Sequence, residues 1–148
     1  MNPSERLSEE MVKAAKAKDK WRLSALRMMK TALHNKEIDL KRVLTDAEFL
    51  QLLSSMVKQR HDSIEQFAKG GRNDLVVKEE AELKVIQEFM PQQLSEAEII
   101  TQIETAIAEA GATGAKDLGK VMKILMPRLT GRADGKAVSD KVKAILTV

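Results

Sequence analysis

The sequence predicts an all-α protein, with an N-terminal four-helix region followed by a C-terminal three-helix bundle. Aromatic residues make up only 3% of the 148 residues while 43% are hydrophobic, so the core has to be built from Leu, Ile, Val, Met and Ala. That composition is typical of packed helices rather than of a β-sandwich. Apolar residues also recur at three- and four-residue steps, and no segment alternates well enough to predict a strand. A chain of this length is expected to be globular, as one domain or two small ones.

Helix-start signals mark the first two helices. Asn2, with Glu5 three residues later, predicts a helix that runs to about Lys18, because both side chains can satisfy exposed backbone N–H groups. Asp19 stands where it can cap a second helix, which is expected to end near Val43. Leu23, Leu26, Met29 or Lys30, and Leu33 recur along this second helix at three- and four-residue steps.

The third helix has the clearest pattern. Thr45 and Glu48 match a capping box, and one apolar stripe then continues from Phe49 to Phe67 before Gly70 and Gly71 stop it. This segment is therefore predicted to be one long helix.

A fourth helix is predicted to open at Asn73 or Asp74 and to end before Pro91, because the residue before a proline is pushed out of helical geometry. The short stretch after Pro91 is interpreted as a linker. We therefore predict two domains, residues 1–91 and residues 95–148.

The C-terminal domain is predicted to be a three-helix bundle. Ser95 and Glu98 form another capping-box pattern, and the helix that follows is expected to end at Gly111. Two further apolar stripes define the remaining helices: Leu118, Val121, Met122 and Leu125, then Val138, Val142, Ile145 and Leu146.

Positive charge is concentrated in two regions. Residues 13–42 hold ten Lys and Arg against three acids, a net +7, and residues 111–148 hold eight against three, a net +5. The acids Glu79, Glu80, Glu82 and Glu88 lie between them. Such runs fit either a lysine-rich solvated helix face or a surface for an acidic partner.

Catalytic motifs are missing from the sequence. No glycine-rich run ends in Gly-Lys-Ser/Thr, so ATP chemistry through a P-loop is not predicted. His34 and His61 fall on different predicted helices, which excludes a two-histidine metal motif on one helical face. Glu79 and Glu80 are neighbours, point about 100° apart on a helix, and are interpreted as a solvated face. We predict no catalytic residue, no metal site and no cofactor.

The sequence also predicts a cytoplasmic protein without a membrane segment. The stretch from Met1 to Arg6 leads into a charged amphipathic helix without the apolar core of a signal peptide, and no run is long enough to span a bilayer. The chain has no cysteine, which is compatible with a reducing compartment.

The turn between the last two predicted helices is the best candidate site. Gly131 is placed to close one helix and Asp134 to cap the next, so Arg132 and Lys136 are expected to project beside the positive end of the last helix, an arrangement suited to phosphate. The predicted nucleic-acid-binding residues are Arg132, Lys136, Arg128, Lys123, Lys120, Lys116 and Lys143, and the turn itself consists of Gly131, Ala133, Asp134 and Gly135. A purely structural role for the turn is the alternative, and it is compatible with a functional arginine.

Three stretches of the chain carry a resemblance to a known family. Residues 58–67, 91–95 and 125–138 resemble the YqeY family, and residues 125–138 are also similar to the C-terminal tail of the B subunit (GatB) of glutamine-dependent aminoacyl-tRNA amidotransferases. The resemblance implies binding of tRNA or structured RNA by the helical region 95–148, led by Arg132 and Lys136. It also implies an aminoacyl-tRNA amidotransferase or synthetase as a protein partner.

Three functions remain open from the sequence. The leading hypothesis is a non-catalytic accessory protein that docks on tRNA or on a tRNA-dependent enzyme. The alternative is a protein-interaction adaptor that works without RNA, in which the basic second helix meets an acidic partner. The third, a carbon-nitrogen ligase that takes its amide nitrogen from glutamine, is implied only by the family resemblance, because the sequence supplies no residues for that chemistry.

Overall fold

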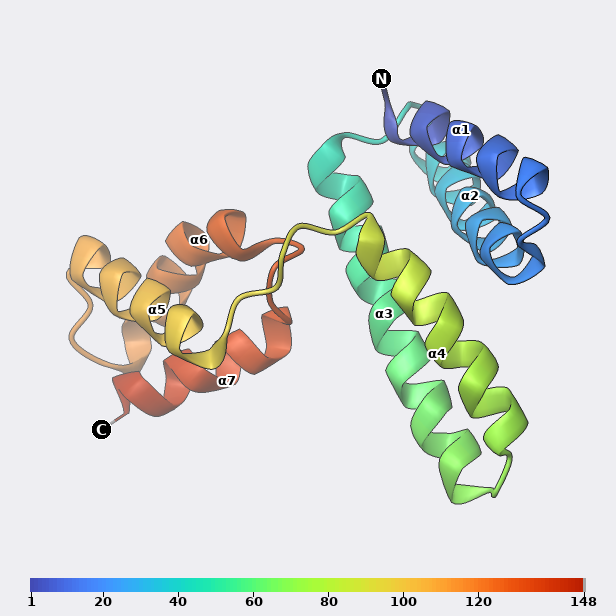
Figure 1. Ribbon diagram of the computed structural model, residues 1–148. Helices are drawn as coiled ribbons and strands as arrows, with labels where there is room; N and C mark the ends of the chain where they lie inside the picture. Colours follow the sequence, from blue (N-terminus) through green and yellow to red (C-terminus); the bar gives the residue numbers. More distant parts are fainter. Residues whose placement is uncertain (148) are drawn as a thin grey trace. The chain divides into compact units, whose positions relative to one another are not determined.

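A computed structural model describes residues 1–147, and all of the regular secondary structure in this range is helical, which confirms the all-α class (Figure 1). The elements are α1 (Pro3–Lys16), α2 (Lys20–Leu40), α3 (Asp46–Lys69), α4 (Asn73–Glu88), α5 (Glu96–Ala110), the short 3₁₀ turn η1 (Ala115–Asp117), α6 (Leu118–Leu129) and α7 (Gly135–Leu146). The chain divides into two compact units, Met1–Pro91 and Gln92–Val148.

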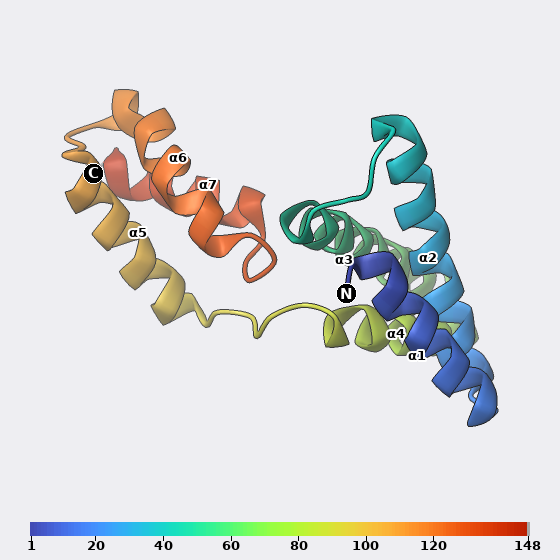
Figure 2. The same ribbon diagram turned by 90° about the horizontal axis from the view of Figure 1, so that it is seen from above.

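The first unit is built from two helical pairs. α1 lies along α2, and α3 lies along α4, as both views of the molecule show (Figures 1 and 2). α4 also packs against α2, whereas α2 and α3 touch each other over a much shorter stretch. This short contact leaves part of the α2 surface that faces α3 uncovered.

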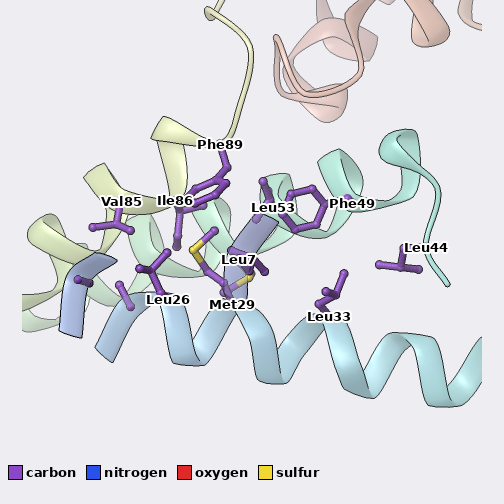
Figure 3. Packing of buried hydrophobic residues seen from close by; sticks show 13 residues of the cluster. Leu7, Leu26, Met29, Leu33, Leu44, Phe49, Leu53, Val85, Ile86 and Phe89 are labelled. Atoms are coloured by element: carbon purple, nitrogen blue, oxygen red, sulfur yellow. The ribbon is translucent and has the colours of Figure 1, made fainter. Parts of the chain in front are cut away.

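The hydrophobic core of the first unit lies where these helices converge. Leu26, Met29 and Leu33 of α2 are fully buried, together with Leu53 of α3 and Ile86 of α4. Figure 3 shows these side chains gathered between α2 and the α3–α4 pair. Burial of each such side chain contributes roughly 1.5–3 kcal/mol, so this cluster provides the main stabilisation of the unit.

The three predicted capping boxes are all formed. In each one, the N-cap side chain accepts a hydrogen bond from the backbone N–H three residues on, and the Glu side chain at that position accepts one from the N-cap N–H. The residue pairs are Asn2–Glu5 in α1, Thr45–Glu48 in α3 and Ser95–Glu98 in α5.

The end of α2 differs from the prediction. α2 ends at Leu40, because Lys41 adopts a left-handed conformation with φ of 58°, and the chain does not continue as a helix to Val43. The Glu37 side chain accepts a hydrogen bond of 3.0 Å from the Leu44 N–H and so helps to hold this exit. α6 runs through Pro127, whose position in the last turn removes only one backbone hydrogen bond.

A buried ionic cluster corrects the interpretation of the α4 acids. Glu80 is exposed, but the side chain of Glu79 is only 17% exposed and that of Glu82 only 6%. Arg60 of α3 places its Nε atom 3.3 Å from a carboxylate oxygen of each of these two acids. Burial raises the pKa of Glu82, and the positive charge of Arg60 opposes that increase. The charge pattern alone did not indicate this cluster, because it depends on the pairing of α3 with α4.

The second unit has its own core, shared by α5, α6 and α7. Its buried residues are Ile103, Ala106, Val121, Leu125, Leu129, Val138 and Val142. Each of the three helices contributes at least two of them, at helical spacing. α6 and α7 are therefore held close together at the turn between them.

Candidate nucleic-acid interface

The turn between α6 and α7 is a tight, hydrogen-bonded structure. α6 ends at Leu129, and its carbonyl oxygen accepts hydrogen bonds from the N–H groups of Arg132 (2.9 Å) and Ala133 (3.2 Å). Gly131 is buried and has φ of 78°, a left-handed conformation that favours glycine. The structure therefore places Gly131 where the predicted helix end required it.

The linker before α5 packs against this turn. The side-chain amide of Gln93 donates a hydrogen bond of 2.7 Å to the Gly131 carbonyl, and the Leu94 N–H donates one of 2.9 Å to the Arg132 carbonyl. In return, the Arg132 Nε donates to the Gln92 carbonyl at 3.3 Å. These contacts hold the backbone on both sides of Arg132 and tie its guanidinium group to the linker.

Sequence reasoning did not assign a role in the site to Gln92 or Gln93. Both residues belong to the stretch 91–95, which the sequence indicates as a linker and as part of the family resemblance. Their contacts with the turn span about 40 residues of chain, so no local pattern indicates them.

The start of α7 differs from the prediction in one detail. Asp134 occupies the N-cap position, and its backbone carbonyl accepts from the Val138 N–H at 3.0 Å. Its side chain makes no capping hydrogen bond, in contrast to the three capping boxes elsewhere. Gly135 follows in close packing, since a Cβ atom there would lie 3.2 Å from the methyl group of Met126. Within residues 1–147, the first backbone N–H groups of α7 therefore do not donate to the side chain of the N-cap residue.

Lys136 and Lys143 form a basic edge on α7. They are seven residues apart, which is two helical turns, so they lie on the same face of the helix. Both are exposed, and neither forms a salt bridge within residues 1–147. Arg132, in the turn, likewise makes no salt bridge in the described part of the chain.

A second group of lysines lies on η1 and α6. Lys116 is in η1, while Lys120 and Lys123 are three residues apart and share a face of α6. All three are exposed and form no salt bridge in the part of the chain that the structure describes. The nearby carboxylate of Asp117 accepts a hydrogen bond from the Thr113 N–H, which is the main reason that its pKa is lowered.

Arg128 is engaged differently from the other predicted residues. Its guanidinium group lies 2.7 Å from a carboxylate oxygen of Glu109 on α5, and the two side chains are 42% and 44% exposed. Five residues separate Arg128 from Lys123, which places it about 140° around the helix. The predicted residues therefore fall into separate groups. Lys120 and Lys123 share one face of α6, and Lys136 and Lys143 share one face of α7. Arg128 points toward α5 instead.

Among residues 1–147, no three His, Asp or Glu side chains are grouped closely enough to hold a metal ion. No helix within the same residues has the length and apolar character needed to cross a bilayer.

Comparison with known proteins identifies relatives along nearly the whole chain. A family model described as "Yqey-like protein" matches residues 4–146. The chain is similar to proteins named "Altered inheritance of mitochondria protein 41, mitochondrial". The protein of that name from Pyrenophora tritici-repentis is 31% identical over 144 residues, which cover 95% of this chain and 79% of the relative. The one from Saccharomyces cerevisiae (strain ATCC 204508 / S288c) is 33% identical over 139 residues, covering 93% and 73%. A third, from Lachancea thermotolerans, is 37% identical over 106 residues, covering 70% of this chain and 57% of the relative.

These names correct the expected location. The relatives are named as mitochondrial proteins, which contradicts the cytoplasmic location predicted from the sequence. The prediction relied on the absence of an apolar signal core. Mitochondrial targeting segments are amphipathic and rich in arginine, so that criterion does not separate the two locations.

Proposed function

This chain belongs to the Yqey-like protein family, and we propose that it is a non-catalytic accessory protein that binds tRNA or another structured RNA through its second compact unit. In this proposal, residues 95–148 act as a three-helix module similar to the GatB tail, and the four helices of residues 1–91 form a separate domain. The protein partner is an aminoacyl-tRNA amidotransferase or synthetase.

One observation carries the proposal: three cations at the α6–α7 turn and on α7 are not paired with an acid in the described part of the chain. Arg132, Lys136 and Lys143 form no salt bridge within residues 1–147, although salt bridges do form nearby at Arg128 and Lys141. Asp134 and Asp140 lie near these cations in the sequence, but neither forms a salt bridge with them within residues 1–147. Cations that are not held in salt bridges are available to contact phosphate groups. The N-terminal end of α7, where no side chain caps the backbone, adds a partial positive charge beside Lys136.

The composition of the second unit favours folded RNA over single strands. Residues 92–148 contain no Phe, Trp or Tyr, so there is no aromatic side chain on which an unpaired base can stack. Duplex regions of RNA are recognised mainly through phosphate groups, 2′-hydroxyls and shape, for which lysine and arginine are sufficient. A tRNA offers such regions.

The direct test is binding of tRNA by the purified chain across a salt series, followed by fluorescence anisotropy. Phosphate contacts make log affinity fall linearly with log salt, and each contact that is lost reduces the slope by about one. The double variant Arg132→Ala/Lys136→Ala is expected to bind about tenfold more weakly near physiological salt and to have a slope smaller by about two.

A matched control removes the same charge elsewhere. Lys69 and Arg72 lie at the exposed end of the α3–α4 pair and are paired with Glu65 and Asp74. The double variant Lys69→Ala/Arg72→Ala is expected to keep the affinity and slope of the parent. If the two double variants lose affinity equally, binding follows total charge and the proposed site is wrong. If the parent does not bind tRNA even at low salt, the proposed function itself is wrong.

A further inference from the structure

The uncovered part of α2 forms one wall of an open groove in the first unit. The groove has a volume of about 490 Å³ and lies between α2 and α3. Its lining from α2 is Ser24, Arg27, Met28, Thr31, Ala32 and Asn35, and its lining from α3 is Met56, Gln59 and Arg60. The α2 residues recur at three- and four-residue steps over a length of about 16 Å, or three helical turns. Such a surface matches the ridges of another helix.

The floor and the walls of this groove differ in chemistry. Met28, Ala32 and Met56 are buried or half-buried and form an apolar floor, whereas the hydroxyl and amide side chains of the lining and Arg27 are exposed and form the walls. Methionine side chains are flexible and polarisable, and they adapt to apolar partners of different shape. No Asp or Glu lines the groove.

A basic ridge runs along α2 beside the groove. Lys20, Arg27 and His34 are spaced seven residues apart, so they follow one edge of the helix at intervals of about 10 Å. All three are exposed, and none forms an ion pair within residues 1–147. Arg27 also borders a smaller hollow of about 300 Å³ on the α1 side, with Met11, Val12 and Leu23 among its lining residues. Arg27 therefore stands between two partly apolar depressions.

Arg60 of α3 adds a hydrogen-bond donor to the groove, although Glu79 and Glu82 balance its charge. Its Nε faces Glu79 and Glu82, but the terminal nitrogen on the groove side donates to the thioether sulfur of Met28, at 3.1 Å. A thioether is a weak acceptor, so this nitrogen is not matched by an anionic partner within the protein. A carboxylate that enters the groove is a stronger acceptor for it.

We propose that this groove binds an acidic amphipathic helix of a partner protein. Apolar side chains of that helix fill the floor formed by Met28, Ala32 and Met56. Acidic side chains seven residues apart on its flank pair with Lys20 and Arg27 and accept a hydrogen bond from the His34 ring, in the way that polar positions beside a coiled-coil seam pair across an interface. This docking site lies in the first unit and does not depend on RNA binding by the second.

The groove favours a protein helix over a nucleic acid for two reasons. A phosphate backbone gains little from the apolar floor, whereas a helix buries its apolar face there. The seven-residue spacing of Lys20, Arg27 and His34, about 10 Å, also equals two turns of a partner helix that lies along α2.

The test uses the full chain and two synthetic helical peptides. The first peptide has a leucine stripe flanked by Glu at seven-residue spacing, and the second has Gln in place of each Glu. The ε-methyl groups of the methionines, labelled with ¹³C, report the binding position by NMR. The acidic peptide is expected to bind with micromolar affinity, about tenfold more tightly than the Gln peptide, and to shift the methyl signals of Met28 and Met56.

Two charge-reversal variants complete the design. Arg27→Glu is expected to weaken binding of the acidic peptide about tenfold, while Lys84→Glu, an equal charge change at an exposed position of α4 outside the groove lining, leaves it unchanged. The proposal is overturned if no saturable binding occurs up to about 1 mM, if the shifts appear at Met122 and Met126 instead, or if Lys84→Glu weakens binding as much as Arg27→Glu. It is also overturned if tRNA, rather than the peptide, shifts the Met28 and Met56 signals. If Arg27→Glu does not fold, the position of the shifts in the parent protein decides the question.

Discussion

Gln93 and Gly131 are joined by a hydrogen bond of 2.7 Å between the side-chain amide of the first and the carbonyl of the second, although 38 residues separate them in the chain. Because Gly131 stands directly before Arg132, this bond ties the linker to the candidate RNA-binding turn. The shape of the turn thus depends on a residue far away in the sequence.

Replacement of Gln93 tests how much this contact stabilises the turn. Gln93→Ala leaves the Gly131 carbonyl without its side-chain donor and is expected to lower the free energy of unfolding by about 1 kcal/mol. Denaturant unfolding followed by circular dichroism measures the effect. Gln92→Ala is the control, because Gln92 contacts Arg132 through its backbone carbonyl, which alanine retains. Equal losses in the two variants would argue against the role given to the Gln93 amide.

Two glycines of the second unit are expected to respond in opposite directions to alanine. Gly131→Ala places a Cβ atom at φ of 78° and is expected to cost about 1–2 kcal/mol. Gly119→Ala lies within α6, where an added Cβ meets no atom within 4 Å, and it is expected to stabilise the protein by up to about 1 kcal/mol. Thermal unfolding of the two variants gives the sign directly. A stabilised Gly131→Ala variant would show that the turn does not require a left-handed residue.

The N-cap residues of α5 and α7 are also expected to respond differently to alanine. Ser95→Ala removes the side chain that caps α5 and is expected to cost about 1 kcal/mol. Asp134→Ala removes a side chain that makes no capping hydrogen bond at α7, so its cost in unfolding free energy is expected to be clearly smaller.

The same Asp134→Ala variant also tests the candidate RNA-binding surface. It removes a negative charge two residues before Lys136. The Asp134→Ala variant should therefore bind tRNA more tightly than the parent in the anisotropy assay.

The buried cluster around Arg60 predicts a large effect on stability. Arg60→Met leaves the carboxylates of Glu79 and Glu82 in the protein interior without a cation, which is expected to cost about 3–5 kcal/mol. The control is Arg72→Met, which breaks a salt bridge to Asp74 between side chains that are 60% and 67% exposed. Its cost is expected to stay within about 1 kcal/mol in denaturant unfolding. Similar losses for both variants would contradict the buried character of the Arg60 cluster.

The capping box of α3 predicts a pH dependence. The pKa of Glu48 is lowered from 4.5 to about 2, mainly by the hydrogen bonds from Arg42 and also by the Thr45 N–H. Because the pKa is lower in the folded state, the stabilisation is complete above pH 4.5 and is lost as the pH falls toward about 2. The difference in unfolding free energy between the parent and Glu48→Gln should accordingly shrink over this range. A difference that stays constant from pH 7 to about 2.5 would show that the carboxylate charge is not involved.

Local signals in the sequence predicted most of the helices. Asn2, Thr45 and Ser95 each precede a Glu by three residues, and all three form the capping boxes that this spacing predicts. The predicted end of α2 was wrong because no residue typical of a helix end stands there. Lys41 ends α2 in a left-handed conformation that is normally marked by glycine, so the predicted end near Val43 was too late.

The candidate site was predicted less completely than the helices. Gly131 indicated the turn, because a left-handed residue is needed there. The contacts of Gln92 and Gln93 with that turn, the pairing of Arg128 with Glu109, and the burial of Glu79 all depend on which helices are neighbours in three dimensions. Such tertiary contacts are not encoded in residue spacing along one helix.

The two hydrophobic clusters of the chain have no residue in common, since every member of one lies before Pro91 and every member of the other after Gln92. A gene rearrangement that divides the coding sequence between these two codons would leave each cluster with all of its side chains. Likewise, when a mutation makes a buried side chain larger or smaller, only neighbours in the same cluster can restore the packing. Over evolutionary time, each half of the protein is therefore free to be duplicated, fused to another gene or diversified on its own.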